Sequence, residues 1–175
     1  MRRTLAIFTL SMMLMTATTF AQNELIEYKA GHTFTISLPD YMSKTGGLNG
    51  DSAIQYKNTV KDVYGLVIFD TKEDLSLVEI KYSSANEFFE DFIKYFLIDE
   101  DKRNVGKPKS QKKGDITFIE CDATYYDKDA QTEIYYLVGI VETKTAFYKV
   151  LSWATAENKD KFKSDFQKIL YSLKD

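Results

Sequence analysis

The chain has 175 residues, in which 23 lysines and arginines stand against 26 aspartates and glutamates, for a net charge of −3 at pH 7. This mildly acidic balance argues against the strongly basic surface with which proteins hold nucleic acid or an anionic membrane. The single cysteine cannot form an internal disulfide, so a chain of this length must rely on a hydrophobic core.

Residues 1–21 have the pattern of a secretory signal peptide. Two arginines near the start supply positive charge, residues 5–15 are mostly apolar, and a small-residue cleavage pattern ends at Ala21. The apolar run is shorter than the ~20 residues that a membrane-spanning helix needs. We therefore predict export to the periplasm or the extracellular space without stable membrane insertion, and a mature chain, residues 22–175, that forms one domain.

The next segments alternate or concentrate apolar residues in the manner of strands. Residues 33–38 alternate strictly between apolar and polar side chains, which is typical of a half-buried strand. Residues 53–58 and 64–71 are the next predicted strands. Within the latter, residues 65–69 are apolar on both faces, so this strand should be central and covered on both sides.

Two segments repeat apolar residues at helical spacing. Residues 84–98 begin with Ser84 and Glu87 in the arrangement of a capping box, followed by a broad stripe rich in phenylalanine. Residues 156–172 carry a second stripe, with charged side chains on the opposite side. Both helices should therefore pack against a large apolar surface.

Residues 116–153 contain three runs rich in β-branched and aromatic side chains, separated by polar breaks at 127–130 and 142–145. Such runs predict a three-stranded antiparallel meander, and residues 107–113 an edge strand beside it. The order of elements predicts an α+β protein, an α-β-α sandwich whose mostly antiparallel sheet has about six strands and carries the two helices on its faces.

Several strings in this order resemble the PsbP-like superfamily. The similarity lies in the opening strand that ends at Pro39, in residues 67–72 followed by 84–89, and in residues 148–153 followed by the closing stripe at 162–172. The resemblance covers nearly all of residues 22–175 and implies the fold. No local motif allows binding residues of the superfamily to be assigned to positions in this chain.

The residue patterns of common catalytic and metal sites do not occur. His32 is the sole histidine, whereas metal sites that use imidazole usually gather several. No nucleophile elbow or phosphate-binding glycine motif is present, and the acidic runs at 99–101 and 127–129 do not match a calcium loop. We therefore expect a protein that is not an enzyme, with no cofactor, no bound metal and no nucleic-acid partner.

The strongest local charge feature is a group of six cations between residues 102 and 113. It fits a patch that docks an anion, a polysaccharide or a partner, but the commoner role of lysines in such a place is to protect an edge strand from aggregation. Tyr126 and Tyr135 flank the first turn of the meander and could be cross-strand neighbours on an aromatic surface. The candidate partner-binding residues are Lys107, Lys109, Lys112, Lys113, Tyr126 and Tyr135.

Two hypotheses follow for the function. The first is an exported non-catalytic binding or accessory protein, whose partner is an unidentified protein or small ligand. The second is a carrier of a small molecule or metal ion, with a pocket between the sheet and the glycine-rich loop Gly46–Gly50.

Overall fold

The computed structural model describes residues 24–31 and 33–175, so the predicted signal peptide and His32 lie outside the described residues. Its main sheet has eight strands in the order β3-β4-β5-β10-β9-β8-β6, with β7 also paired to β8, and all these pairs are antiparallel. In chain order the strands are β3 (Ser43–Thr45), β4 (Ile54–Asn58), β5 (Val63–Thr71), β6 (Asp101–Val105), β7 (Lys109–Lys113), β8 (Ile116–Asp127), β9 (Thr132–Glu142) and β10 (Ala146–Thr155).

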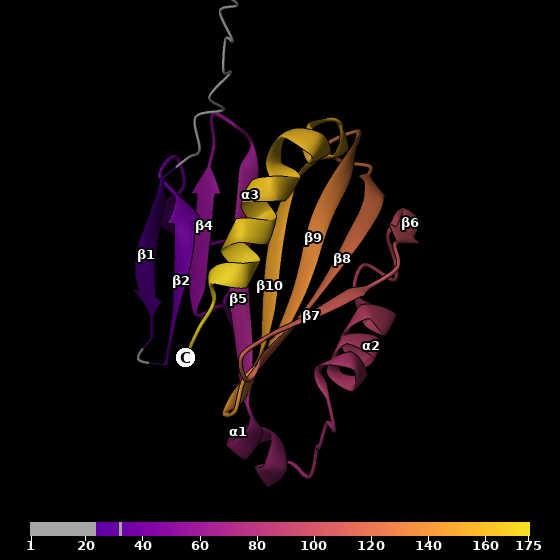
Figure 1. Ribbon diagram of the computed structural model, residues 1–175. Helices are drawn as coiled ribbons and strands as arrows, with labels where there is room; N and C mark the ends of the chain where they lie inside the picture. The colour runs from indigo at the N-terminus through magenta and orange to yellow at the C-terminus, as the bar shows by residue number, and fades with distance from the viewer. Residues whose placement is uncertain (1–23, 32) are drawn as a thin grey trace, which may run out of the picture.

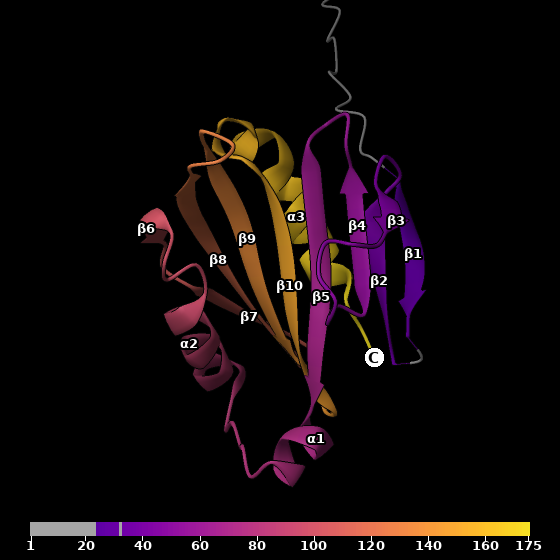
Figure 2. The same cartoon turned by 180° about the vertical axis from the view of Figure 1, so that it is seen from behind.

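Helices and a separate hairpin cover the two faces of this sheet. One face carries α3 (Lys159–Ser172), preceded by a 3-10 turn at Ala156–Asn158, together with the hairpin of β1 (Leu25–Ala30) and β2 (Phe34–Pro39) (Figure 1). The other face carries α2 (Ala85–Tyr95), with the short α1 (Lys72–Leu77) on the same side at one end (Figure 2). The predicted α-β-α sandwich is confirmed.

The prediction of about six strands is wrong, because two short polar edge strands were not recognised. β3 lies in a segment that has the glycines of a loop, and β6 lies in the charged stretch before β7. Neither contains an alternating apolar pattern. Both are strands because their backbone groups pair with β4 and β8.

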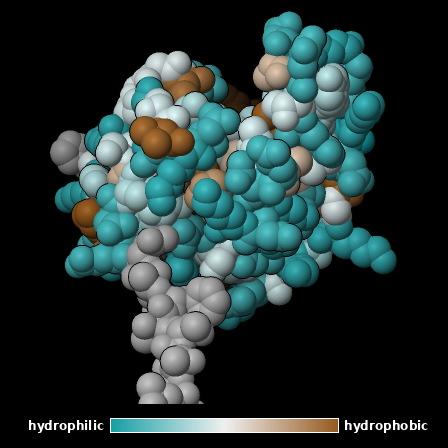
Figure 3. Space-filling view, turned by 90° about the horizontal axis from the view of Figure 1, so that it is seen from above, coloured by the Kyte–Doolittle hydropathy of each residue, from teal (hydrophilic) through white to brown (hydrophobic). Residues whose placement is uncertain are grey.

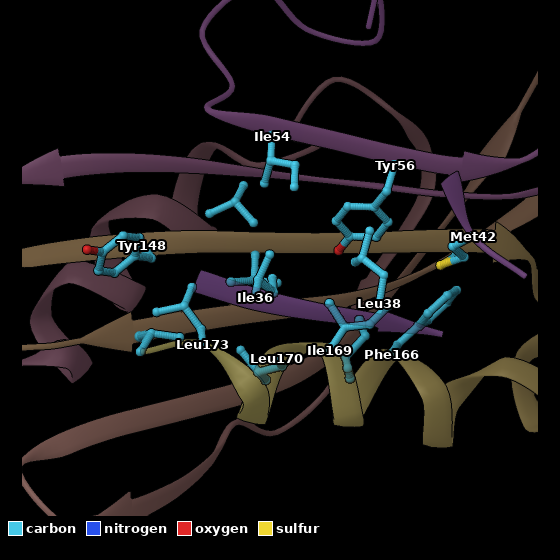
Figure 4. Close-up of a cluster of buried hydrophobic side chains, with 14 of the residues drawn as sticks. Ile36, Leu38, Met42, Ile54, Tyr56, Tyr148, Phe166, Ile169, Leu170 and Leu173 are labelled. Atoms are coloured by element: carbon cyan, nitrogen blue, oxygen red, sulfur yellow. The ribbon is translucent and has the colours of Figure 1, made fainter. Parts of the chain in front are cut away.

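The first core lies between the sheet, α3 and the β1–β2 hairpin (Figure 4). Phe34, Ile36 and Leu38 of β2 are all buried, as the strict alternation in this strand predicts. The ring of Tyr56 lies across Gly65 of β5. Glycine leaves room for this ring, because a Cβ at position 65 would collide with it. The Tyr56 hydroxyl pairs with that of Ser152 at 2.8 Å, so this buried polar group is satisfied.

The second core lies between the sheet and α2. Phe88 and Phe89 of α2 pack on the apolar side chains of β8, β9 and β10, including Cys121, Ile140 and Phe147. The central β5 contributes to both cores, with Leu66 on this face and Val67 on the other. Its predicted central position is confirmed.

The two ends of α2 are fixed by specific contacts. Ser84 caps the start by accepting from the Glu87 amide, while the Glu87 carboxylate reaches back to the backbone and hydroxyl of Ser83, at 2.7 Å each. The helix ends at Tyr95 and not at residue 98. Leu97 has a φ of +57°, which a helix cannot continue through.

Among the described residues, no helix is both long enough and apolar enough to span a membrane. The end of the molecule that holds the β4–β5 and β8–β9 turns is mainly hydrophilic, and its apolar atoms form small separate spots (Figure 3). The described residues that are visible in this view therefore form no large apolar docking surface.

Candidate functional site

The lysine-rich segment forms a border along β8. β6 pairs with the second half of β8 and β7 with the first half, and the break between them falls at Gly106, whose amide donates to the Asp122 carbonyl at 2.8 Å. Every residue of β7 is exposed. In the described part of the chain β7 pairs with β8 alone, so its outer edge has no strand partner.

The lysines of β7 lie on both faces of this edge. Lys109 is opposite Glu120 on β8 and Lys113 is opposite Ile116, which places both on the face that carries α3. Lys112 is opposite Thr117 and lies on the other face. The border is therefore cationic from both sides, and it is not a one-sided patch.

The two candidate tyrosines do not form the predicted cross-strand pair. The first hairpin closes with Asp127 opposite Thr132, so Tyr126 faces Glu133 and Tyr135 faces Thr124. Tyr126 is half-buried, and the Lys102 ammonium lies 4.7 Å from its ring centroid.

Tyr135 is buried in the first core and is not available to a partner. Its exposed fraction is 0%, and its ring stacks on Phe166 of α3. Its hydroxyl donates to Asp122 Oδ1 at 2.9 Å. Burial and the nearby Asp122 carboxylate raise the pKa of Tyr135 far above its ordinary value, so this hydroxyl stays protonated.

A polar groove of about 570 Å³, here called the β7–α3 groove, runs beside the cationic border. One wall is Lys109–Gln111 of β7. The other is a single helical face of α3, formed by Ser164, Gln167, Lys168 and Tyr171.

Glu120 forms the floor of the β7–α3 groove. It is 5% exposed. The Gln167 side-chain amide donates to both of its carboxylate oxygens, at 3.0 and 2.9 Å, and the Tyr171 hydroxyl donates at 3.1 Å. The Lys109 ammonium is 3.9 Å away. Sequence reasoning missed Glu120 because it stands in an apolar run and its partners lie about fifty residues later.

Asp122 ties α3 to β8 next to this groove. Lys159 and Lys163 approach its Oδ2 at 2.9 and 2.6 Å. Partial burial opposes the charge of this carboxylate, but the two lysines and the Tyr135 hydroxyl outweigh that effect and lower the pKa of Asp122. Lys107 lies at the same end, where it lines a small cavity of about 60 Å³ with Lys109 and Asp122.

The glycine-rich loop Gly46–Gly50 is packed down on the sheet. Leu48 contacts the second core. The Gln55 side-chain oxygen accepts from the amides of Leu48 and Asn49, and its nitrogen donates to the Asn49 carbonyl. Nowhere in residues 24–31 and 33–175 do three or more histidine, cysteine or acidic side chains converge in a way that could hold a metal ion.

No protein-family profile matches the sequence, and no curated protein matches it. The structure is similar to that of cyanobacterial PsbP from Synechocystis sp. PCC 6803, with a TM-score of 0.60 and 12% identity over 92% of this chain and 98% of that one. The chain has the PsbP-like fold. LpqN of Mycobacterium tuberculosis, involved in cell envelope biogenesis, is similar with a TM-score of 0.58 and 8% identity over 87% of this chain and 89% of LpqN.

At these identities the PsbP-like likeness establishes the fold and assigns no functional residue. The cationic border and the groove beside it are therefore described from this chain alone. Of the six candidate residues, the structure brings Lys107, Lys109, Lys112 and Lys113 together at one edge. Tyr126 lies at the far end of β8, and Tyr135 lies in the core.

Proposed function

We propose that this protein is an exported, non-catalytic accessory protein that binds a protein partner by adding an extended acidic segment to the outer edge of β7. The observation that carries the proposal is the unpaired edge of β7 with lysines on both of its faces. Backbone hydrogen bonds at such an edge supply affinity for an extended peptide, and the flanking side chains supply specificity.

The distribution of charge selects the occupant. A second copy of β7 would place lysines opposite lysines, so the border opposes self-association. An acidic strand in the same place would project its side chains alternately to the two faces. It would meet Lys109 and Lys113 on one face and Lys112 on the other. The same lysines thus repel a copy and attract an acidic partner.

Two further observations support the export and the accessory role. The pattern of residues 1–21 is that of a signal peptide, and we propose that residues 22–175 fold as one exported domain. The structurally similar LpqN is involved in cell envelope biogenesis, which fits an accessory role at the envelope.

Strand addition can be tested with a fluorescein-labelled peptide of alternating glutamate and threonine, titrated with the protein and followed by fluorescence anisotropy. We expect saturable binding that weakens as salt rises, and at least tenfold weaker binding of the matching lysine–threonine peptide. The acidic peptide with N-methylation at alternate residues on its pairing edge should also lose binding, because it has lost the donors that pair with β7.

The matched variants reverse two charges at opposite edges of the main sheet. Lys112→Glu with Lys113→Glu should reduce affinity for the acidic peptide about tenfold, since each reversal turns an attraction into a repulsion. Lys44→Glu with Lys57→Glu, near the β3 edge, should leave it unchanged. Equal binding of the N-methylated peptide, or equal losses in both double variants, would rule out strand addition at β7.

A further inference from the structure

A second groove of about 300 Å³ lies on the opposite face of the sheet, between α2 and the segment that follows α1. Figure 2 shows α1 and α2 on this side of the molecule, joined by that segment. The wall of the groove combines acidic and aromatic side chains with one ammonium. The groove, here called the α2 groove, is lined chiefly by Asp70, Tyr82, Phe88, Asp91, Phe92 and Lys149.

The protein already places a cation of its own against these rings. The Lys149 ammonium pairs with Asp70 at 2.8 Å. It lies 5.3 Å from the ring centroid of Phe88 and 5.9 Å from that of Phe92. Aromatic faces attract cations at such distances, and more strongly where water is partly excluded. This part of the molecule therefore favours positive charge.

The other carboxylate of the α2 groove, Asp91, forms no ion pair within the described part of the chain. It accepts a hydrogen bond from the Tyr82 hydroxyl at 2.7 Å. The lining of the groove therefore holds two carboxylates against one ammonium, and Lys94, three residues along α2, acts on Asp91 from outside the lining. The half-buried ring of Phe92 lies one residue along the helix.

We propose that the α2 groove binds an organic monocation, an ammonium group bearing alkyl substituents, which would pair with Asp91 and lie against the aromatic lining. The volume suits a small ligand. A free amine and a lysine side chain of a partner both carry this chemistry. An inorganic cation would fit worse, because the aromatic rings offer it no ligand oxygens.

The proposal can be tested by titrating the isotope-labelled protein with choline and following the backbone amide resonances. We expect saturable shifts at residues 82–95 and at Lys149. The neutral analogue 3,3-dimethylbutan-1-ol has nearly the same shape, and it should bind about tenfold more weakly because it lacks the charge. A parallel titration with Nα-acetyl-lysine methylamide decides whether a partner's lysine side chain is accepted as well as a free amine.

Three variants locate the site. Asp91→Asn should weaken choline binding about fivefold or more, since it removes the negative charge of Asp91 without changing the shape of the side chain. Asp99→Asn, an exposed carboxyl outside the groove, is the control and should change nothing. Lys149→Met removes the resident ammonium and should strengthen binding, provided that its thermal unfolding shows an intact fold.

The proposal is overturned if choline and its neutral analogue bind equally well, or if choline produces no saturable shifts in the α2 groove. It is equally overturned if Asp91→Asn and Asp99→Asn weaken binding alike, because the attraction would then be a general one to an acidic surface.

Discussion

At the scale of single residues, the buried and half-buried acids show how polar groups link the layers. Glu120 is held by an amide and a hydroxyl of α3, with the Lys109 ammonium 3.9 Å away, whereas Asp122 is held by two closer lysines and a tyrosine hydroxyl. Asp122 therefore contributes an attraction that depends on its charge. Its lowered pKa is the measurable sign of that attraction.

The lowered pKa of Asp122 predicts that part of the free energy of unfolding is lost in acid. The folded-state pKa of Asp122 lies below the ordinary value of 3.8, so its contribution is full above that value and is lost as the pH falls through the folded pKa. Asp122→Asn should lower the free energy of unfolding by about 1–2 kcal/mol at pH 7. The difference from the unmodified protein should shrink below pH 3.8.

Urea unfolding at pH 7 and at a pH well below that value checks the prediction. Asp115→Asn serves as the control, because Asp115 is an exposed turn residue. A deficit in Asp122→Asn that stays constant across the two conditions would mean that the charge of Asp122 is not what stabilises the fold.

At the scale of elements, α2 depends on a residue that belongs to the border segment. The Arg103 side chain of β6 donates to the carbonyl oxygens of Ile93 and Phe96, which lie at the end of α2. These carbonyls have no partners within the helix. Arg103 thus joins the border strand to the helix that forms one wall of the α2 groove, and it is not free for a partner.

Replacement of Arg103 should loosen α2 specifically. Arg103→Ala removes two charge-assisted hydrogen bonds and should lower stability by about 1–3 kcal/mol. Arg103→Lys should restore only part of the loss, because an ammonium cannot reproduce the planar fork of the guanidinium. In hydrogen exchange, the amides of α2 should lose more protection than those of β9.

Lys102→Ala is the matched control, since Lys102 is the exposed neighbour of Arg103 and its ammonium lies against the ring of Tyr126 on β8. If both variants lose stability equally, Arg103 acts as one more surface charge and not as a cap of α2.

At the scale of the whole molecule, the sheet separates two cores that share no helix. The first core is closed by α3 and the β1–β2 hairpin together. Apart from the pairing of its own two strands, the hairpin contacts α3 more than any other element. Phe166 of α3 is fully buried in this core. The hairpin should therefore depend on α3 more than on the main sheet.

Phe166→Ala should cost about 3–5 kcal/mol, as truncations of buried phenylalanine do. We expect amide protection in β2 to fall with it, while α2 on the other face keeps its protection relative to the global unfolding limit. Phe89→Ala, in the second core, should show the reverse pattern. Identical exchange patterns in the two variants would show that the cores unfold as one unit.

The sequence was sufficient for the elements that carry strong periodicity, namely β2, the meander, α2 and α3, because their buried faces repeat at fixed spacing. It was insufficient for β3 and β6, which are polar and become strands through backbone pairing alone. The lysine border could be located from charge. The buried position of Tyr135 could not be predicted, because the length of the turn after Asp127 sets the register between β8 and β9.

The acidic residues of the two grooves could not be predicted as site residues, for a related reason. Glu120 and its partner Gln167 are joined only when α3 packs over β8, and Asp70, Asp91 and Lys149 come from three separate elements. Sites of this kind depend on tertiary contacts that no local pattern contains.

Residues that follow α3 and its last turn hold β2 in place. Thr35 and Lys174 exchange backbone hydrogen bonds at 2.8 and 3.2 Å, and the Ser37 amide donates to the Ser172 hydroxyl at 2.8 Å. A chain that is made from its N-terminus therefore carries Phe34, Ile36 and Leu38 for some time before α3, which completes their core, has been synthesised. During that interval an export machinery or a chaperone would meet an incompletely folded substrate.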